Sequence, residues 1–330
     1  MSKVNIVDIT KRLDPNGKIA AIAELLEQSN EILTDMPLYE CNNGDGHKVT
    51  IRNELPDVSW RMFNYGVKNS KSKTQQVTDT TGMLEAYAEV DKDLAELNGN
   101  TKEFRLSEDR AFLEAMNQEF ARTLFYGNTN IKKSEFMGLA PRYNAYATNS
   151  GTSADHVIDC GGTTNLTSIY LVVWGQNTVF GLYPNGSKAG LTMNDKGQVT
   201  LEDADGGKYE GYRSHYQLKT GLTVKDWRYV VRLANIDVTA LKADPTTGEL
   251  SLIDKIIDAI ELIPNINLGK PVFYGNKKIT SALRKQIKNA KNVTLSLEEV
   301  FGKKVLHVDG IPFRKTDALL NTESKVNALA

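Results

Sequence analysis

The chain has 330 residues and a formal net charge of −1, with 40% hydrophobic and 25% charged residues. These proportions are close to the averages of soluble globular proteins and exclude a disordered chain. The near-neutral charge excludes the strongly basic surface that tight binding to a phosphate backbone requires.

Cysteine usage and the terminal sequence indicate synthesis in a cytoplasm. Cys41 and Cys160 are the only cysteines, which is too few for a disulfide framework and leaves no CxxC pair. The first residues contain no apolar core of signal-peptide length, and no later run approaches the length of a membrane span. We therefore expect reduced thiols and no contact with a membrane.

Residues 1–46 are predicted to form an arm with one short helix. Asp14 and Pro15 are placed as an N-cap and a first helical residue, and apolar residues then follow a helical spacing to Thr34. Pro37 and the glycine-containing run that follows it end this helix.

From residue 47 onward the apolar period changes to two. This alternation predicts two strands separated by a turn, with apolar positions at Val49, Ile51, Val58, Trp60 and Met62. The segment 67–82 has almost no apolar side chain to bury, and a polar stretch of this length inside a globular chain is either functional or loose.

Charge is divided unevenly along this region, with +4 over residues 47–78 and −5 over residues 79–97. A basic projecting hairpin and an acidic base could pair head to tail between identical subunits. Two solvated faces that never meet explain the same pattern, and both interpretations stay open. The candidate assembly contacts are Trp60, Arg61, Lys68, Lys71, Lys73, Glu85 and Glu89.

Residues 107–126 are predicted to form one long amphipathic helix. Ser107 is a good N-cap, Glu108 and Asp109 place negative charge at the positive end of the helix dipole, and Gly127 can take a left-handed turn. One stripe of apolar side chains recurs at four-residue spacing, at Phe112, Met116, Phe120 and Leu124.

The rest of the chain predicts a mixture of strands and helices. A Gly-, Thr-, Asn- and Ser-rich loop is expected over 144–168, followed by strands at 169–174, 178–183, 209–219 and 227–236. Ser251 and Asp254 start a helix that Pro264 stops, and a second helix begins at Asn276 and ends near Asn289. Short strands are expected at 271–274 and 305–308, before a tail without obvious structure from Asp309.

The sequence contains no motif for catalysis, cofactors or metals: GxxxxGK[ST], HExxH, GxSxG and GxGxxG are all absent. Asp203, Asp205 and Glu210 do not fit a twelve-residue calcium loop, so a hairpin turn is predicted there. We predict no enzyme and no cofactor or metal site. Ordinary strand or loop positions are expected for the four widely separated histidines, His47, His156, His215 and His307.

Three stretches carry a resemblance to a known family through their order and spacing. They are LNGNTKEFRLSEDRAFLEAMNQEFARTLFYGN (Leu97–Asn128), YQLKTGLTVKDWRYVVRLANID (Tyr216–Asp237) and KKVLHVDGIPFRKTDALLNTE (Lys303–Glu323). Together they resemble the major capsid proteins of tailed double-stranded-DNA bacteriophages, and most closely those of short-tailed phages. The resemblance covers nearly the whole chain and implies an α+β fold of the HK97-like capsid type.

The resemblance implies four parts of the chain. Residues 1–46 resemble an N-terminal arm, and residues 47–97 resemble an extended loop that reaches over a neighbouring subunit. Residues 98–240 resemble a peripheral domain with a spine helix and a β-rich insertion. Residues 241–330 resemble an axial domain with a C-terminal strand that returns to the peripheral domain. How the strands of 145–240 divide between the two domains stays open.

The implied function is that of a structural protein of the virion, which assembles in the bacterial host cytoplasm into an icosahedral capsid around double-stranded genomic DNA. The implied partners are copies of the chain in pentamers and hexamers, a portal protein, and packaged DNA bound without sequence specificity. A decoration or cement protein is left open.

The sequence differs from those of some relatives in two features, and each difference leads to an expectation about assembly. There is no room ahead of the arm for the long helical scaffolding region of some relatives, so a separate scaffolding protein is expected. Other relatives crosslink a lysine of the extended loop, but the motif around Lys68, Lys71 and Lys73 does not match, and crosslinking is not expected.

Three alternatives remain. They are an encapsulin-like compartment shell, a phage tail or baseplate protein, and a carbohydrate-binding or hydrolytic domain in the β-rich middle, which would require a pocket with convergent polar groups.

Overall fold

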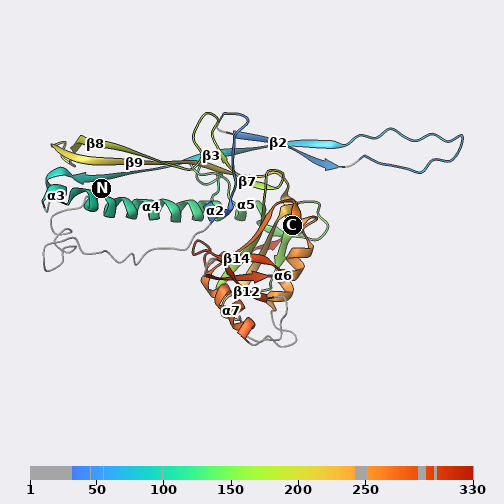
Figure 1. Cartoon of the computed structure of the whole chain (residues 1–330). Helices are drawn as coiled ribbons and strands as arrows, with labels where there is room; N and C mark the ends of the chain where they lie inside the picture. Colours follow the sequence, from blue (N-terminus) through green and yellow to red (C-terminus); the bar gives the residue numbers. More distant parts are fainter. Residues whose placement is uncertain are drawn as a thin grey trace.

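The computed structural model describes residues 32–44, 46–54, 56–97, 100–241, 251–288, 295–300 and 303–329. An elongated upper layer with a projecting hairpin lies across a lower body of strands and helices (Figure 1). Most of the predicted N-terminal helix lies outside the described residues, which begin with α2 (Ile32–Asp35).

The long helix α4 (Thr101–Tyr126) has 26 residues and is therefore about 39 Å long. It begins ahead of Ser107, so the predicted N-cap was wrong. The extra turns are stabilised because Phe104 is buried in a small cluster with Val90 and Ala95. These contacts join α4 to other elements, so the sequence of the helix alone does not indicate them.

The predicted apolar stripe of α4 is confirmed, because Met116, Phe120 and Leu124 are buried and Phe112 is partly buried against the same core. Gly127 ends the helix, but with a φ of −53° it does not take the left-handed turn that was predicted. Glycine is needed there for a different reason. A Cβ at this position would lie 2.6 Å from the carbonyl oxygen of Thr123 and also overlap that of Phe136.

An antiparallel sheet covers α4 in the upper layer (Figure 1). Thr81–Asp91, the second part of the 19-residue strand β3 (Lys73–Asp91), pairs with β9 (Lys208–Val224). β9 pairs in turn with β8 (Leu191–Glu202), and the short helix α3 (Lys92–Glu96) joins β3 to α4. Side chains of β3 alternate, so that Ala88 and Val90 are buried while Tyr87 is exposed.

The first part of β3 pairs with β2 (Gly46–Glu54), which makes the projecting hairpin. Residues 56–72 between the two strands contain no regular structure, so the strand predicted around Val58, Trp60 and Met62 was wrong. Alternating apolar residues form a strand where there is a surface to bury them, and the described part of the chain offers this segment no such surface. The polar stretch 67–82 is largely the start of β3.

The lower body is a mixed sheet with helices against it. Its strands are hydrogen-bonded in the order β12 (Leu295–Val300), β13 (Lys303–Val308), β14 (Ile311–Lys315), β11 (Lys270–Gly275), β6 (Leu166–Trp174) and β10 (Val230–Asp237), which also pairs with β5 (Val157–Asp159). β7 (Val179–Tyr183) pairs with β9 and touches β6, and so links the lower sheet to the upper one; β1 (Leu38–Glu40) pairs with β7.

The helices of the lower body follow the predicted capping signals. α6 (Leu252–Glu261) is capped by Ser251, whose hydroxyl accepts from the amide of Asp254 at 3.4 Å. In α7 (Lys277–Lys288), the side chain of Asn276 accepts from the amide of Ile279 at 3.0 Å. The predicted starts of both helices are therefore confirmed.

Two predicted loops contain regular structure. The stretch 144–168 holds β4 (Ala145–Tyr146), a 3-10 turn η1 (Ser153–His156) and β5, and the carboxylate of Asp155 organises it by accepting from the amides of Ser150 and Gly151. The tail after Asp309 contains β14. This strand was not predicted, because it contains Pro312 and proline disfavours strands. The remaining short elements are α5 (Leu139–Arg142), η2 (Trp227–Tyr229), η3 (Ile266–Leu268) and β15 (Asn327–Ala328), which pairs with β4.

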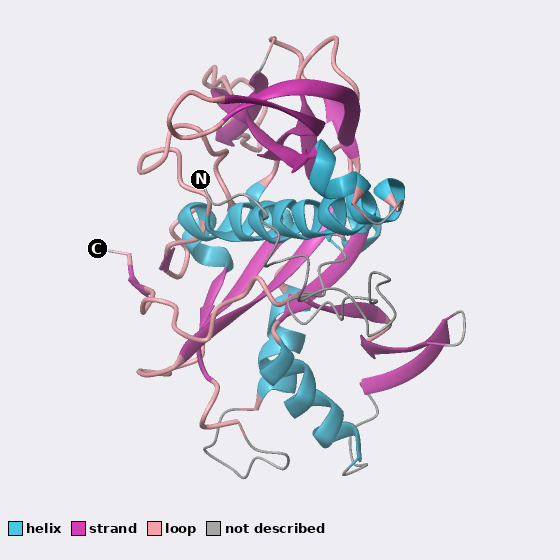
Figure 2. Ribbon diagram, turned by 90° about the vertical axis from the view of Figure 1, so that its left-hand side faces the viewer, coloured by secondary structure: helices cyan, strands magenta, loops and turns pink. Residues whose placement is uncertain are grey.

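One hydrophobic core joins the upper layer to the lower body. The C-terminal half of α4 contributes Phe120, Leu124 and Phe125, and the same cluster includes residues of β6, β10, β11, α6 and α7. Phe125, for example, packs on the rings of Tyr170 and Tyr274 at centroid distances of 5.2 and 6.2 Å. Figure 2 shows α4 between the strands above it and the body below.

Candidate assembly interface

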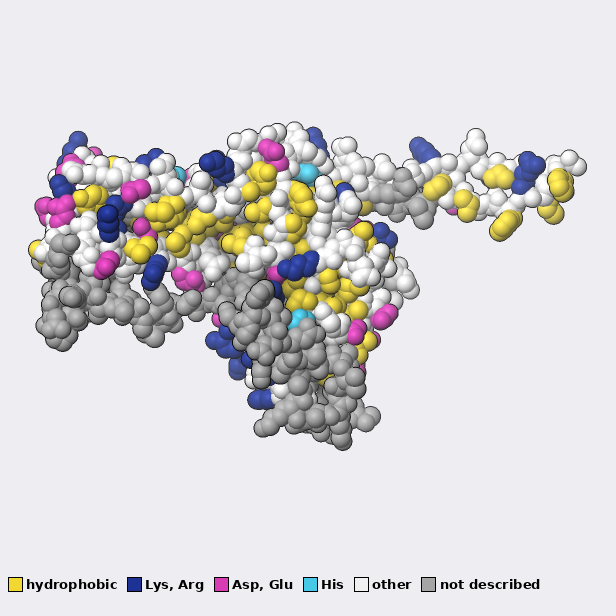
Figure 3. All heavy atoms as spheres, viewed as in Figure 1, with side chains coloured by type: hydrophobic (Ala, Val, Ile, Leu, Met, Phe, Trp, Pro, Cys, Tyr) yellow, Lys and Arg dark blue, Asp and Glu magenta, His cyan; other side chains and the backbone are white. Residues whose placement is uncertain are grey.

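The projecting hairpin ends in a segment that its own chain does not cover. We call residues 56–72 the tip. Trp60 is 104% exposed and Phe63 is 91% exposed, and Figure 3 shows hydrophobic side chains spread along the end of the hairpin. Contiguous exposed apolar side chains mark sites of interaction with other molecules. The other large apolar side chains exposed on the tip are Val58, Met62, Tyr65 and Val67.

Local hydrogen bonds shape the tip but do not bury it. The amide of Tyr65 donates to the carbonyl of Met62 at 3.3 Å, and the hydroxyl of Ser70 donates to the carbonyl of Asp57 at 2.8 Å. The second of these bonds spans the open loop. The tip therefore presents its apolar side chains on a loop that is held across its width.

The base of the hairpin is anchored by a buried ion pair. Asp79, whose side chain is 5% exposed, accepts from Arg142 at 2.7 Å and from the hydroxyl of Thr223 at 2.8 Å. Arg142 also donates to the carbonyls of Met137 and Leu222. β3 is thus fixed to α5 and β9 at the point where the hairpin leaves the body.

The predicted basic contacts lie on or beside the tip. Arg61, Lys68 and Lys71 are exposed on it together with Trp60, and Lys73 is the first residue of β3. Within the chain, the structure does not bring these residues together with the acidic base, because the tip projects away from the upper sheet (Figure 1).

The predicted acidic contacts lie on the outer face of the upper sheet, where the chain itself provides partners. Glu89 forms an ion pair with Arg213 at 2.7 Å. Glu85 lies 3.6 Å from His215 and accepts a hydrogen bond from Gln217. These contacts follow the register of β3 and β9, in which Glu85 faces Gln217 and Glu89 faces Arg213.

The structure contains two buried polar clusters that were not predicted from the sequence. Arg232 and Glu323 form an ion pair at 2.9 Å with side chains 5% and 4% exposed, and Ser168 bonds to both. Asp35 accepts from Lys270 at 2.6 Å and from Tyr274 at 3.2 Å. The partners are far apart in sequence, so no local spacing could have indicated them.

The described residues also bear on the predictions about metals, membranes and the turn at Asp203. They contain no group of three or more His, Cys, Asp or Glu that could hold a metal ion, and no helix in them is long and apolar enough to cross a membrane. The predicted hairpin turn at Asp203 is confirmed, because its carboxylate accepts from the amides of Asp205 and Gly207 in the turn between β8 and β9.

A long helix under an antiparallel sheet, a projecting hairpin with an apolar tip and a separate sheet-and-helix body define a shell-forming capsid protein of the HK97-like type. The family model of the major capsid protein GP7 matches residues 14–327, and the chain belongs to this family. The predicted fold and function are therefore confirmed: the protein is a structural capsid protein of a phage virion.

Chains in three solved structures are similar to this chain. A chain of bacteriophage Epsilon15 is 38% identical, with a TM-score of 0.78, over 99% of this chain and 98% of that chain. A chain of the bacteriophage JBD30 capsid is 10% identical, with a TM-score of 0.49, over 89% of this chain and 92% of that chain. The encapsulin SrpI of Synechococcus elongatus PCC 7942 is 11% identical, with a TM-score of 0.44, over 74% of this chain and 100% of that chain. No curated protein sequence matches the chain.

Proposed function

We propose that the protein forms a closed icosahedral shell of pentamers and hexamers around phage double-stranded DNA, and that it does so without catalytic activity. The observation that carries the proposal is the tip, an apolar loop on an anchored hairpin. Its side chains gain burial only in contact with another molecule, and a second copy of the chain is the partner that every shell supplies.

The pairing of strands supports a division of the chain into parts. We assign α4, β8, β9 and Thr81–Asp91 to the peripheral domain, because these residues form one sheet over one helix. The extended loop is then 47–80, shorter than its sequence-based range of 47–97. We assign the sheet of β6 and β10–β14, with α6 and α7, to the axial domain; residues 1–46 keep the role of an arm.

We assign the contact with a neighbouring subunit to the tip. Trp60 is the central anchor, because aromatic side chains bury the largest apolar area. Arg61, Lys68 and Lys71 add positive charge to the same tip, which favours one register of the contact over others. Glu85 and Glu89 have partners in their own chain, so any part they take in the contact is shared with Arg213 and His215.

Other partners follow from the capsid function. We propose a separate scaffolding protein during assembly and a portal protein at one vertex, with a decoration protein as an optional addition. Packaged DNA is held without sequence specificity, which is compatible with a net charge of −1.

The test is electron microscopy of the purified protein, expressed with and without a co-expressed scaffolding partner and fractionated by sedimentation. Closed icosahedral particles from the expressed protein support the shell. DNA of uniform length inside particles recovered from infected cells supports the proposed contents. Tubes or rings would contradict the proposal, and so would particles from infected cells that enclose a protein cargo instead of DNA.

A tip variant tests the assigned contact. Replacing residues 58–71 by a short Gly-Ser turn should leave a folded subunit that forms no durable shell. The matched control is Asp205→Ser, a change in the exposed turn between β8 and β9, which should assemble normally. Normal particles from the tip variant, with unchanged resistance to denaturant, would contradict the assignment.

A further inference from the structure

The exposed face of α6 carries an acidic and apolar stripe. Asp254, Ile257, Asp258 and Glu261 follow one another at spacings of three, one and three residues, and positions three and four apart share a helix face. The opposite face is buried in the core through Leu252, Ile256 and Ala259. We call the exposed set the acidic stripe; its members are Asp254, Ile257, Asp258, Glu261 and Leu262.

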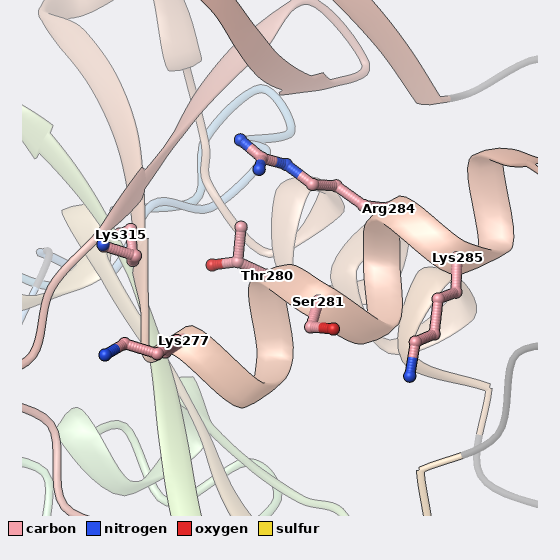
Figure 4. Close-up of a pocket in the computed structure, with 6 residues that line it drawn as sticks. All are labelled: Lys277, Thr280, Ser281, Arg284, Lys285 and Lys315. Atoms are coloured by element: carbon pink, nitrogen blue, oxygen red, sulfur yellow. The ribbon is translucent and has the colours of Figure 1, made fainter.

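The exposed face of α7 carries a basic stripe. Ile279, Ala282 and Leu283 face the core, and the exposed positions include four cations and no acid. A shallow hollow between α7 and β14 is lined by Lys277, Arg284 and Lys315, whose side chains border it in Figure 4. The members of the basic stripe are Lys277, Lys278, Ser281, Arg284 and Lys285.

The two stripes lie on opposite sides of the lower body. α7 lies at the end of the sheet that holds β14, and α6 lies toward the opposite end, against β10 (Figure 1). The space-filling view shows Lys and Arg side chains on one side of this body and Asp and Glu side chains on the other (Figure 3). A subunit with complementary surfaces on opposite sides fits a head-to-tail ring, in which each copy uses one side toward each neighbour.

We propose that the acidic stripe of one copy binds the basic stripe of the next copy around the symmetry axes of the shell. This inference rests on the proposed function, since it names the surface through which axial domains meet. The carboxylates of Asp258 and Glu261 enter the basic hollow, and the aliphatic stems of the lysine and arginine side chains cover Ile257 and Leu262.

A second copy fits the pair of stripes better than nucleic acid does. A phosphate backbone would bind the basic stripe, but it would leave the acidic stripe and its apolar side chains unexplained. Ile257 is 36% exposed and Leu262 is 37% exposed, so a protein surface gains burial there. Among the described residues, the basic stripe has one long ion pair, between Lys277 and Asp317 at 3.9 Å, and the acidic stripe has one, between Asp258 and Lys255 at 3.5 Å.

Charge reversal tests the inference. The acid-reversed variant is Asp258→Lys with Glu261→Lys, and the base-reversed variant is Arg284→Glu with Lys285→Glu. Each should lower the assembled fraction at least about tenfold, because like charges then meet across the contact. A chain with all four changes restores the complementarity and should assemble to within about twofold of the unchanged chain. The control, Lys196→Glu with Asp205→Lys, reverses exposed charges on the upper sheet and should assemble normally.

The outcomes separate the inference from the proposed function. Circular dichroism and thermal unfolding of each subunit establish that it is folded before assembly is scored by sedimentation and microscopy. If the unchanged chain forms shells and either single-side variant does too, the inference is wrong and the shell function stands. If the four-change chain fails while remaining folded, the pairing of stripes is refuted. Normal shells of the base-reversed variant with reduced nucleic acid content would assign the basic stripe to nucleic acid and overturn the inference.

Co-expression of the two single-side variants provides a further readout. One variant then has two basic sides and the other has two acidic sides, so complementary contacts require the two to alternate. Alternation closes in a ring of six but not in a ring of five. We expect the mixture to form six-membered rings or sheets in place of closed shells, whereas closed shells from this mixture would contradict the pairing.

Discussion

The ion pair at the base of the hairpin gives the sharpest stability prediction. Replacing Asp79 by alanine leaves Arg142 in a site where its own side chain is only 17% exposed, and also removes the acceptor of Thr223. Breaking a buried ion pair by removing one partner costs about 3–5 kcal/mol. Arg142 keeps its bonds to the carbonyls of Met137 and Leu222, so we expect the lower end, about 3 kcal/mol.

The assay is urea unfolding of unassembled subunits, followed by fluorescence and circular dichroism. A slope of about 3 kcal/mol per molar urea would convert this loss into a midpoint lowered by about 1 M. The matched control is Glu89→Ala, on the same strand. The Glu89 and Arg213 side chains are 25% and 33% exposed, and pairs near the surface are worth about 0–1 kcal/mol. If Asp79→Ala cost no more than Glu89→Ala, the reasoning that burial decides the value of these pairs would be refuted.

Further predictions concern three other sites. Gly127→Ala should lower the free energy of unfolding by about 1–3 kcal/mol, because the added Cβ overlaps backbone oxygens, whereas Gly66→Ala, with open space around it, should change it little in the same urea titration. Glu323→Gln should cost about 3 kcal/mol or more, because it leaves the charge of Arg232 buried, and a loss below 1 kcal/mol would contradict this account. Burial lowers the pKa of His156 below 6.5, so the unfolded chain binds a proton that the folded chain does not, and stability should fall as the pH drops from 7 to 5. His156→Phe should reduce that fall; an unchanged pH dependence would show that His156 does not contribute.

The elements that were predicted correctly are those whose signals are local. The apolar run at 169–174 became β6, and Ser251 and Asn276 cap α6 and α7 as their spacing indicates. Strong capping residues and long apolar runs fix a conformation before any distant contact forms. The start of α4 was missed for the converse reason, since Phe104 is buried against a distant strand.

The candidate interface was only partly accessible from the sequence. The charge pattern and the polar segment 67–82 indicated a projecting hairpin as one of two interpretations, yet the alternation at Trp60 predicted a strand that the structure does not contain. The acidic residues were identified as a group, but their cross-strand partners depend on the register of β3 and β9. The stripes of α6 and α7 are visible in the sequence, whereas their position on opposite sides of one body comes only from the fold.

The continuity of β3 has a mechanical consequence. This single strand runs from the tip into the sheet over α4, so a pull on the tip along the hairpin acts as shear on the pairs between Thr81–Asp91 and β9. Ladder hydrogen bonds are perpendicular to the strands, so shear loads many of them together instead of opening them one after another. Under the proposed contact at the tip, a load on the tip would thus be distributed over the whole ladder between Thr81–Asp91 and β9 in each subunit.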